Sequence, residues 1–230
     1  MTSKETFDEV LAVTNRMISL GLCNEQNYPK IEKVGRDTEI TIAGKLNLSA
    51  SLRNVEYREI YDALSISRSY NIMMLDGGLV QMLYTFTGRT LRSHHLAYFP
   101  SPDFEAFQND EELYLTDEIY ADILQKSILP CPVRFDFDES DKLHEEIFHP
   151  KSHLTLGQYT NCRIPVSAAL TPCEFAGFVL RSFYGSAYRK FNGTLWPNSH
   201  RFDEILTSAE QSILHVRLCH PKYSRLDTAG

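Results

Sequence analysis

Three strand-like runs joined by two tight turns, in residues 69–99, constrain the fold of this chain more than any other feature. Apolar and polar residues alternate in these runs with the period of a β-strand. The runs are separated by Asp76-Gly77-Gly78 and by Thr87-Gly88, residue types that tolerate the positive φ of hairpin turns. The sequence therefore predicts a three-stranded antiparallel meander.

Helices are expected on both sides of the meander. Thr2 and Glu5 have the spacing of a capping box, and the helix they open ends near Gly21, while Thr171 and Glu174 form a second such box. Further helices are expected at residues 54–64 and after Thr116, and a last helix, which Ser208 and Gln211 cap, is expected to run to Leu218. Further strands are expected at residues 38–44, 133–138, 153–157 and 161–165. Residues 24–29 are expected to form a polar loop. The implied fold is α+β: one domain, residues 1–230, with an antiparallel sheet of meander hairpins and later short strands, packed by N-terminal and C-terminal helices.

Charge and composition narrow the classes of function. The 23 Lys and Arg residues against 30 Asp and Glu give a net charge of −7. Binding to a nucleic-acid backbone usually needs a basic surface, so we expect nucleic acid to reach this chain through a partner. The five cysteines are scattered without a CxxC pair, which argues against a disulfide framework and a cysteine zinc site. No run approaches the roughly 20 apolar residues of a membrane span, and the polar start is unlike a signal peptide, so no membrane association and a cytoplasmic location are expected.

The residues that could carry chemistry gather in residues 132–165. Arg134, Asp136 and Asp138 are spaced two apart on a predicted strand and should project from one face. With His153, the two carboxylates could hold Mg²⁺ or Mn²⁺, which would activate a water nucleophile on a phosphodiester. The alternative is that Arg134 simply pairs with one of the aspartates on an exposed face and contributes little. The candidate catalytic residues are Arg134, Asp136, Asp138, His149, Lys151 and His153, and the candidate metal ligands are Asp136, Asp138 and His153.

Other chemistries find less support. His153 and Thr155 have the His-x-Thr form of two-histidine phosphoesterases, but such enzymes need a second copy, and none is found. His94 and His95 should point to opposite faces of the sheet, so at most one of them shares a site. The pair Gly77-Gly78 lacks the Lys and Ser or Thr of a phosphate loop, so no nucleotide cofactor is expected. The acidic residues between Asp103 and Glu112 are read as a solvated loop.

Several longer phrases resemble a known bacterial family. FPSPDFEAFQNDEELY, DEIYADIL, RFDFD and HPKSHLTLGQYTNCRIP, with the preceding YNIMMLDGGLVQMLY, are similar to the domain of unknown function twenty-two ninety. The resemblance makes residues 52–188 the family core, 1–50 an N-terminal helix and strand extension, and 189–230 a C-terminal helical appendage. It implies a partner, because members are found beside a helicase gene in a two-gene anti-phage system, but it implies no catalytic residues. A shorter likeness, in the hairpin and in Arg134-Phe135-Asp136 and His149-Pro150-Lys151-Ser152-His153, is to TumE-like toxins.

Two hypotheses of different class follow. In the first, the chain is the effector of a helicase-linked defence pair and a metal-dependent nuclease. In the second, it is a non-enzymatic adaptor that docks on the helicase through the segment FPSPDFEAFQ, residues 99–108, whose phenylalanines would fill pockets on the partner. We expect that convergence of Asp136, Asp138, His149 and His153, with or without Tyr70, Arg92 and Arg163, in one concave pocket would favour the first.

Overall fold

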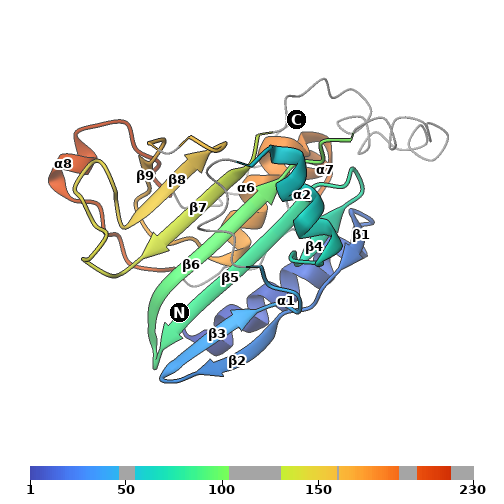
Figure 1. The fold of residues 1–230 in the computed structure, drawn as a ribbon, viewed down its shortest axis with the longest axis horizontal. Helices are drawn as coiled ribbons and strands as arrows, with labels where there is room; N and C mark the ends of the chain where they lie inside the picture. Colours follow the sequence, from blue (N-terminus) through green and yellow to red (C-terminus); the bar gives the residue numbers. More distant parts are fainter. Residues whose placement is uncertain (47–54, 104–130, 160, 192–200, 219–230) are drawn as a thin grey trace, which may run out of the picture.

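A single antiparallel sheet organises the computed structural model, which describes residues 1–46, 55–103, 131–159, 161–191 and 201–218. Within these residues the sheet has nine strands in the order β1-β4-β5-β6-β7-β8-β9, and β3 pairs with both β2 and β5 (Figure 1). The strands are β1 Cys23–Gln26, β2 Lys30–Val34, β3 Asp37–Thr41, β4 Ile72–Met74, β5 Leu79–Thr87, β6 Thr90–Phe99, β7 Val133–Asp138, β8 Ser152–Leu156 and β9 Ile164–Pro165. The predicted meander is confirmed as β4, β5 and β6.

Helices pack on both faces of the sheet. They are α1 Ser3–Ser19, α2 Tyr57–Ile66, α6 Pro172–Phe183, α7 Gly185–Phe191 and α8 Ser208–Gln211. The capping boxes at Thr2 with Glu5 and at Thr171 with Glu174 are both formed, so the starts of α1 and α6 agree with the sequence. The α+β class is confirmed. The helix expected after Thr116 lies outside the described residues.

Two expected elements are corrected. The polar loop expected at residues 24–29 contains most of β1, which pairs with β4, and β2 follows it directly. Their polar side chains are largely exposed at the sheet edge, so the sequence carries no apolar alternation there. The capping box of the last helix is formed by Thr207 and Glu210, one residue before the expected Ser208 and Gln211. The helix ends at Gln211 and not at the expected Leu218. Beyond it the chain turns, and Val216 forms an isolated parallel bridge with Val166, in which Val216 donates to the carbonyl of Pro165 and accepts from Ser167.

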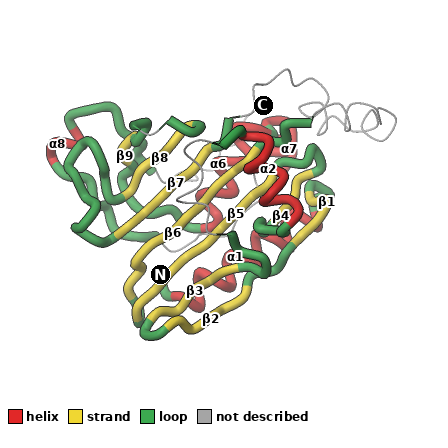
Figure 2. Tube along the Cα trace, in the orientation of Figure 1, coloured by secondary structure: helices red, strands yellow, loops and turns green. Residues whose placement is uncertain are grey.

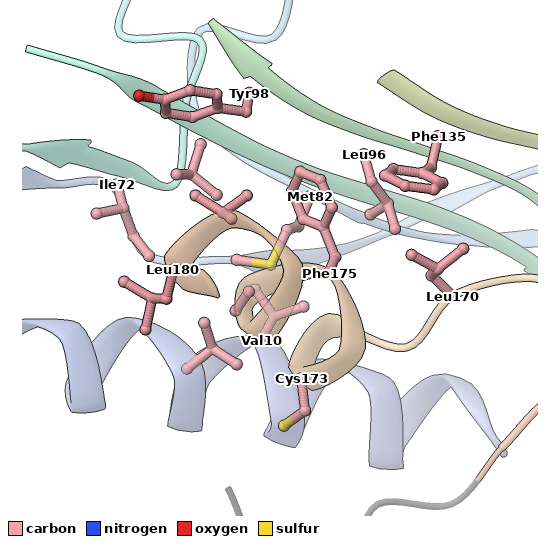
Figure 3. Close-up of a cluster of buried hydrophobic side chains, with 14 of the residues drawn as sticks. Val10, Ile72, Met82, Leu96, Tyr98, Phe135, Leu170, Cys173, Phe175 and Leu180 are labelled. Carbon is pink, nitrogen blue, oxygen red and sulfur yellow. The ribbon is translucent and has the colours of Figure 1, made fainter. Parts of the chain in front are cut away.

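The main core lies between the sheet and the pair α1 and α6. Val10 of α1 and Phe175 and Leu180 of α6 are fully buried against sheet residues such as Met82 and Leu96 (Figure 3). Such dense apolar burial supplies most of the favourable free energy of folding. In Figure 2 these helices lie behind the sheet and α2 lies in front of it.

The described residues cover the opposite face only in part. Helix α2 buries Ile60, Tyr61 and Leu64 against Ala97 and Phe99 of β6 and their neighbours. A bidentate ion pair of Arg58 with Asp103, at 2.6 Å for both bonds, ties α2 to the end of the meander. The part of this face formed by β6, β7 and β8 is left for a pocket. No helix in the described ranges is long and apolar enough to cross a membrane.

Candidate active site

A pocket of about 240 Å³ lies on the α2 side of the sheet, over β6, β7 and β8. Its walls include Ile60 of α2, Phe99 of β6, the connection between β7 and β8, and residues 157–159. All six candidate catalytic residues predicted from the sequence line it: Arg134, Asp136, Asp138, His149, Lys151 and His153. The pocket is of modest size for a binding site, and its concave shape with convergent polar groups is what a catalytic site requires.

Strand register explains why these side chains meet. In β7, Arg134, Asp136 and Asp138 alternate with the buried Val133, Phe135 and Phe137, as the sequence predicts. Antiparallel pairing then places His95 of β6 and His153 of β8 directly opposite Asp136, one on each side. The result is a row of three side chains, His95, Asp136 and His153, across three adjacent strands.

His95 and Asp136 form a hydrogen-bonded dyad. The distance from Nδ1 of His95 to Oδ1 of Asp136 is 2.8 Å. Burial raises the pKa of the Asp136 carboxyl, but the hydrogen bond from His95 and the charges of His95 and Arg134 outweigh it, so the pKa lies below its usual value. An ionised carboxylate only accepts hydrogen bonds, so Nδ1 of His95 carries the proton and Nε2 is the basic nitrogen of the neutral ring. The His95 side chain is 58% exposed and can therefore reach a substrate.

A backbone carbonyl, and not the Asp136 carboxylate, orients the ring of His153. Its Nδ1 lies 2.9 Å from the carbonyl oxygen of Pro150, which can only accept, so here too Nε2 is the unprotonated nitrogen of the neutral ring. Burial lowers the pKa of His153 despite the nearby Asp136 carboxylate. The ring of His149 stands edge-on to that of His153, with centroids 5.3 Å apart. Burial first, and the Arg163 guanidinium second, lower the pKa of His149.

The described residues that line the pocket carry more positive than negative charge, in a chain that is acidic as a whole. Its lining includes Arg134, Lys151 and Arg163 against the carboxylates of Asp136 and Asp138. Lys151 is paired at the rim with Asp141, at 2.6 Å. Within the described ranges, neither arginine has a carboxylate within ion-pair distance. Two planar guanidinium groups in a concave site favour an anionic ligand, and phosphate matches their geometry.

The connection between β7 and β8 is built by local hydrogen bonds. Asp138 accepts from the backbone N–H of Ser140 at 2.8 Å, which turns the chain at the end of β7. Glu145 and His149 exchange two backbone hydrogen bonds, and between them Ile147 has a φ of 73°. Left-handed backbone is unfavourable for a β-branched residue, so this loop stores strain beside the site.

The candidate metal ligands do not form a preassembled cluster. Among the described residues, no group of three or more His, Cys, Asp or Glu side chains is arranged to hold a metal ion. The hydrogen bonds described above use Oδ1 of Asp136, Oδ1 of Asp138 and Nδ1 of His153, one atom of each side chain, so the metal-dependent hypothesis stays a prediction. We therefore derive no step through Mg²⁺ or Mn²⁺.

The sequence missed the role of His95. It predicts that one of His94 and His95 is packed, and His94 is fully buried, but it offers no reason to pair His95 with Asp136. The pairing depends on β6 lying beside β7, although residues 104–130 separate them in the chain. Of the other residues considered, Arg163 lines the pocket, whereas Arg92 pairs with Glu139 and Tyr70 with Glu25 outside it.

Comparison with known proteins identifies one family. The model of a family described as "Uncharacterized conserved protein (DUF2290)" matches residues 22–218, a wider range than the 52–188 indicated by the sequence phrases. The match includes every residue of the row formed by His95, Asp136 and His153. No curated protein and no solved structure matches the chain.

Proposed function

The chain belongs to the DUF2290 family of uncharacterized conserved proteins, and from this premise and the geometry of the pocket we propose that it is a nuclease that cleaves phosphodiesters by general acid–base catalysis. The observation that carries the proposal is the row of His95, Asp136 and His153. Two imidazoles on either side of one carboxylate can serve as base and acid for the two oxygens of a displacement at phosphorus. The catalytic set is then His95 and His153, with Asp136 orienting His95.

The groups in the pocket supply each role. Nε2 of His95 takes the proton of the attacking hydroxyl, and Asp136 holds the ring in the required tautomer and stabilises the imidazolium that forms. Arg134 and Arg163 stabilise the charge that develops on the phosphoryl oxygens. His153, protonated at Nε2, gives its proton to the leaving oxygen. Burial lowers the pKa of His153, so its ring is neutral before substrate binds, and the negative charge of a bound phosphodiester favours the protonated form that acts as the acid.

The biological setting belongs to the same proposal. The family resemblance supports a role as effector subunit of a two-component, helicase-linked anti-phage system, with the helicase delivering nucleic acid. The acidic chain, with its net charge of −7, is suited to a subunit that does not bind nucleic acid tightly alone. The positive charges of Arg134, Lys151 and Arg163 in the pocket would then act on a strand that the partner presents.

Cleavage by the purified full chain tests the proposal. Fluorescent DNA and RNA oligonucleotides are incubated with the chain at high concentration, once in EDTA and once with Mg²⁺ or Mn²⁺. We expect cleavage in EDTA, and we expect His95→Ala to reduce it by a factor of about 10² to 10⁴. His215→Ala is the matched control, because His215 is not among the described residues that line the pocket and its Nδ1 lies 2.9 Å from the carbonyl oxygen of Ile213. No cleavage in any condition, or equal loss in both variants, would refute the proposal, and cleavage that requires the metal would restore the metal-dependent hypothesis.

The adaptor hypothesis is the alternative. Its docking segment, residues 99–108, is described only as far as Asp103, and Phe104 and Phe107 lie outside the described residues. The hydrogen bond from Tyr57 to the carbonyl of Pro100, at 2.6 Å, anchors the start of this segment on α2. The adaptor predicts that Phe104→Ala combined with Phe107→Ala abolishes co-purification with the helicase. Retained binding would remove this alternative.

A further inference from the structure

We propose that the substrate is single-stranded RNA and that the ribose 2′-hydroxyl is the attacking nucleophile. This inference rests on the proposed function and names the substrate class of the same site. It is carried by three features of the pocket: the imidazole base it offers, the placement of its two imidazoles on either side of Asp136, and the aromatic side chains at its rim.

The first feature concerns the source of the nucleophile. The dyad of His95 with Asp136 offers an imidazole base in the pocket. A lone imidazole is a weak means of directing a free water onto a phosphodiester. A hydroxyl already attached beside the phosphorus gains an effective molarity on the order of 10⁵ M or more from its fixed position. The 2′-hydroxyl of RNA is such a group, and DNA lacks it.

The second feature is the placement of the two imidazoles. His95 and His153 lie on β6 and β8 with β7 between them, so their Cα atoms are about 10 Å apart. Both side chains line the same pocket as Asp136, which lies between them in the row. A phosphodiester bound over Asp136 therefore has one imidazole on the side of its attacking oxygen and the other on the side of its leaving oxygen.

The step balances without a further reactant. Nε2 of His95 removes the proton of the 2′-hydroxyl, and the 2′-oxygen forms a bond to phosphorus. The bond from phosphorus to the 5′-oxygen of the next nucleotide breaks, and that oxygen takes a proton from Nε2 of His153. The products are a 2′,3′-cyclic phosphate and a free 5′-hydroxyl. One proton enters His95 and one leaves His153, so the net charge of the site is unchanged.

The third feature is the rim. Tyr159 lines the pocket with 73% of its surface exposed, and Phe148, adjacent to His149, is 70% exposed. Exposed aromatic rings beside a cationic pocket suit unpaired bases, which stack on them with little sequence preference. Bases in a duplex are already stacked on one another, so the rim favours a single strand.

Three oligonucleotides of one sequence test the inference in EDTA with the purified full chain. They are all-ribose, all-deoxyribose, and deoxyribose with one ribose in the middle. We expect the first to be cut at many positions, the second not at all, and the third only on the 3′ side of its ribose. A 2′-O-methyl group on that ribose should abolish the cut, and mass spectrometry should find the cyclic phosphate.

The outcomes separate this inference from the proposed function. Cleavage of the all-deoxyribose strand, or products with a 5′-phosphate, would overturn the RNA inference and leave the nuclease proposal standing. No cleavage of any strand would overturn both. For the rim, Tyr159→Ala should raise KM by a factor of about 5 to 100 with a smaller change in kcat. Tyr28→Ala, at another exposed tyrosine outside the pocket, should leave KM unchanged, and equal effects at both positions would contradict the stacking role.

Discussion

The two neighbouring histidines of β6, His94 and His95, lie on opposite faces of the central sheet and in opposite environments. His94 points into the core, is fully buried, and accepts a hydrogen bond at Nε2 from the backbone N–H of Leu170 at 3.1 Å. His95, the next residue, is exposed on the pocket side and donates to Asp136. Burial lowers the pKa of His94 to about 3, so it stays neutral and acts as a core side chain. The two-residue period of the strand therefore determines which of the two histidines faces the pocket and is accessible to a substrate.

The faces also differ in how completely they are covered. Helices α1 and α6 close the His94 side with apolar packing, whereas α2 covers only part of the His95 side (Figure 1). The part that α2 does not cover holds the charged side chains and the strained loop at Ile147. Changes on one face should therefore alter stability, and changes on the other should alter activity.

The largest expected effect distinguishes the two carboxylates of the pocket face. Asp136→Asn should lower kcat by a factor of about 10² to 10⁴, because an amide cannot hold His95 in the same tautomer. Asp138→Asn should cost less than about tenfold, since an amide oxygen can still accept from Ser140. Steady-state cleavage of an RNA oligonucleotide measures both. Equal losses would indicate that the two carboxylates act together, as metal ligands do.

The next effect belongs to the core face. His94→Ala should lower the free energy of unfolding by about 2 to 4 kcal/mol, because it leaves a cavity and an unpaired N–H at Leu170. His95→Ala, the matched change one residue away, should lower it by no more than about 1 kcal/mol. Urea denaturation measures both. A larger loss for His95→Ala would contradict the division between the faces.

Acid should weaken the core face in a defined pH range. The pKa of His94 is about 3 in the folded protein, below its usual value near 6.5, so the unfolded chain binds more protons between these values. Its contribution to stability is therefore complete above about pH 6.5 and is lost as the pH falls towards 3. Between pH 7 and 5 we expect a loss of about 2 kcal/mol from this residue. Burial also lowers the pKa values of His149 and His153, so these two residues also contribute stability that is lost as the pH falls.

A variant isolates that contribution. His94→Gln keeps an acceptor for the Leu170 amide but cannot titrate, so its free energy of unfolding should fall less steeply with acid than that of the parent chain. Urea denaturation at several pH values measures the difference in slope. Parallel curves for the two proteins would show that His94 is not the titrating group.

The smallest effect tests the strained loop. Ile147→Gly should raise the free energy of unfolding by up to about 1 kcal/mol, because glycine adopts a φ of 73° without the penalty of a β-branched side chain. Val34→Gly, in the exposed strand β2 with ordinary backbone, is the control and should destabilise. A loss of stability at Ile147→Gly would mean that the loop is not strained there.

Local patterns account for what could be predicted from the sequence. The capping boxes at Thr2 and Thr171 and the alternation around Asp136 depend on residues a few positions apart, and each is confirmed. The dyad of His95 with Asp136 depends on a strand pairing across residues 104–130, which no local pattern encodes. The strands β1 and β2 were missed for a related reason, since only their partners in the sheet identify these polar segments as strands.

The claim that His95 and His153 act together on a phosphate in the pocket is tested most directly by the response of the histidine rings to a ligand that the pocket should bind. Long-range ¹H–¹⁵N spectra of the imidazoles can be recorded as uridine 3′-monophosphate is added to the full chain. We predict that the nitrogen signals of His95 and His153 shift together with a single dissociation constant, while those of His94 stay in place. Unchanged His95 and His153 signals at saturating ligand, or a shift of His94 as large as theirs, would contradict the account.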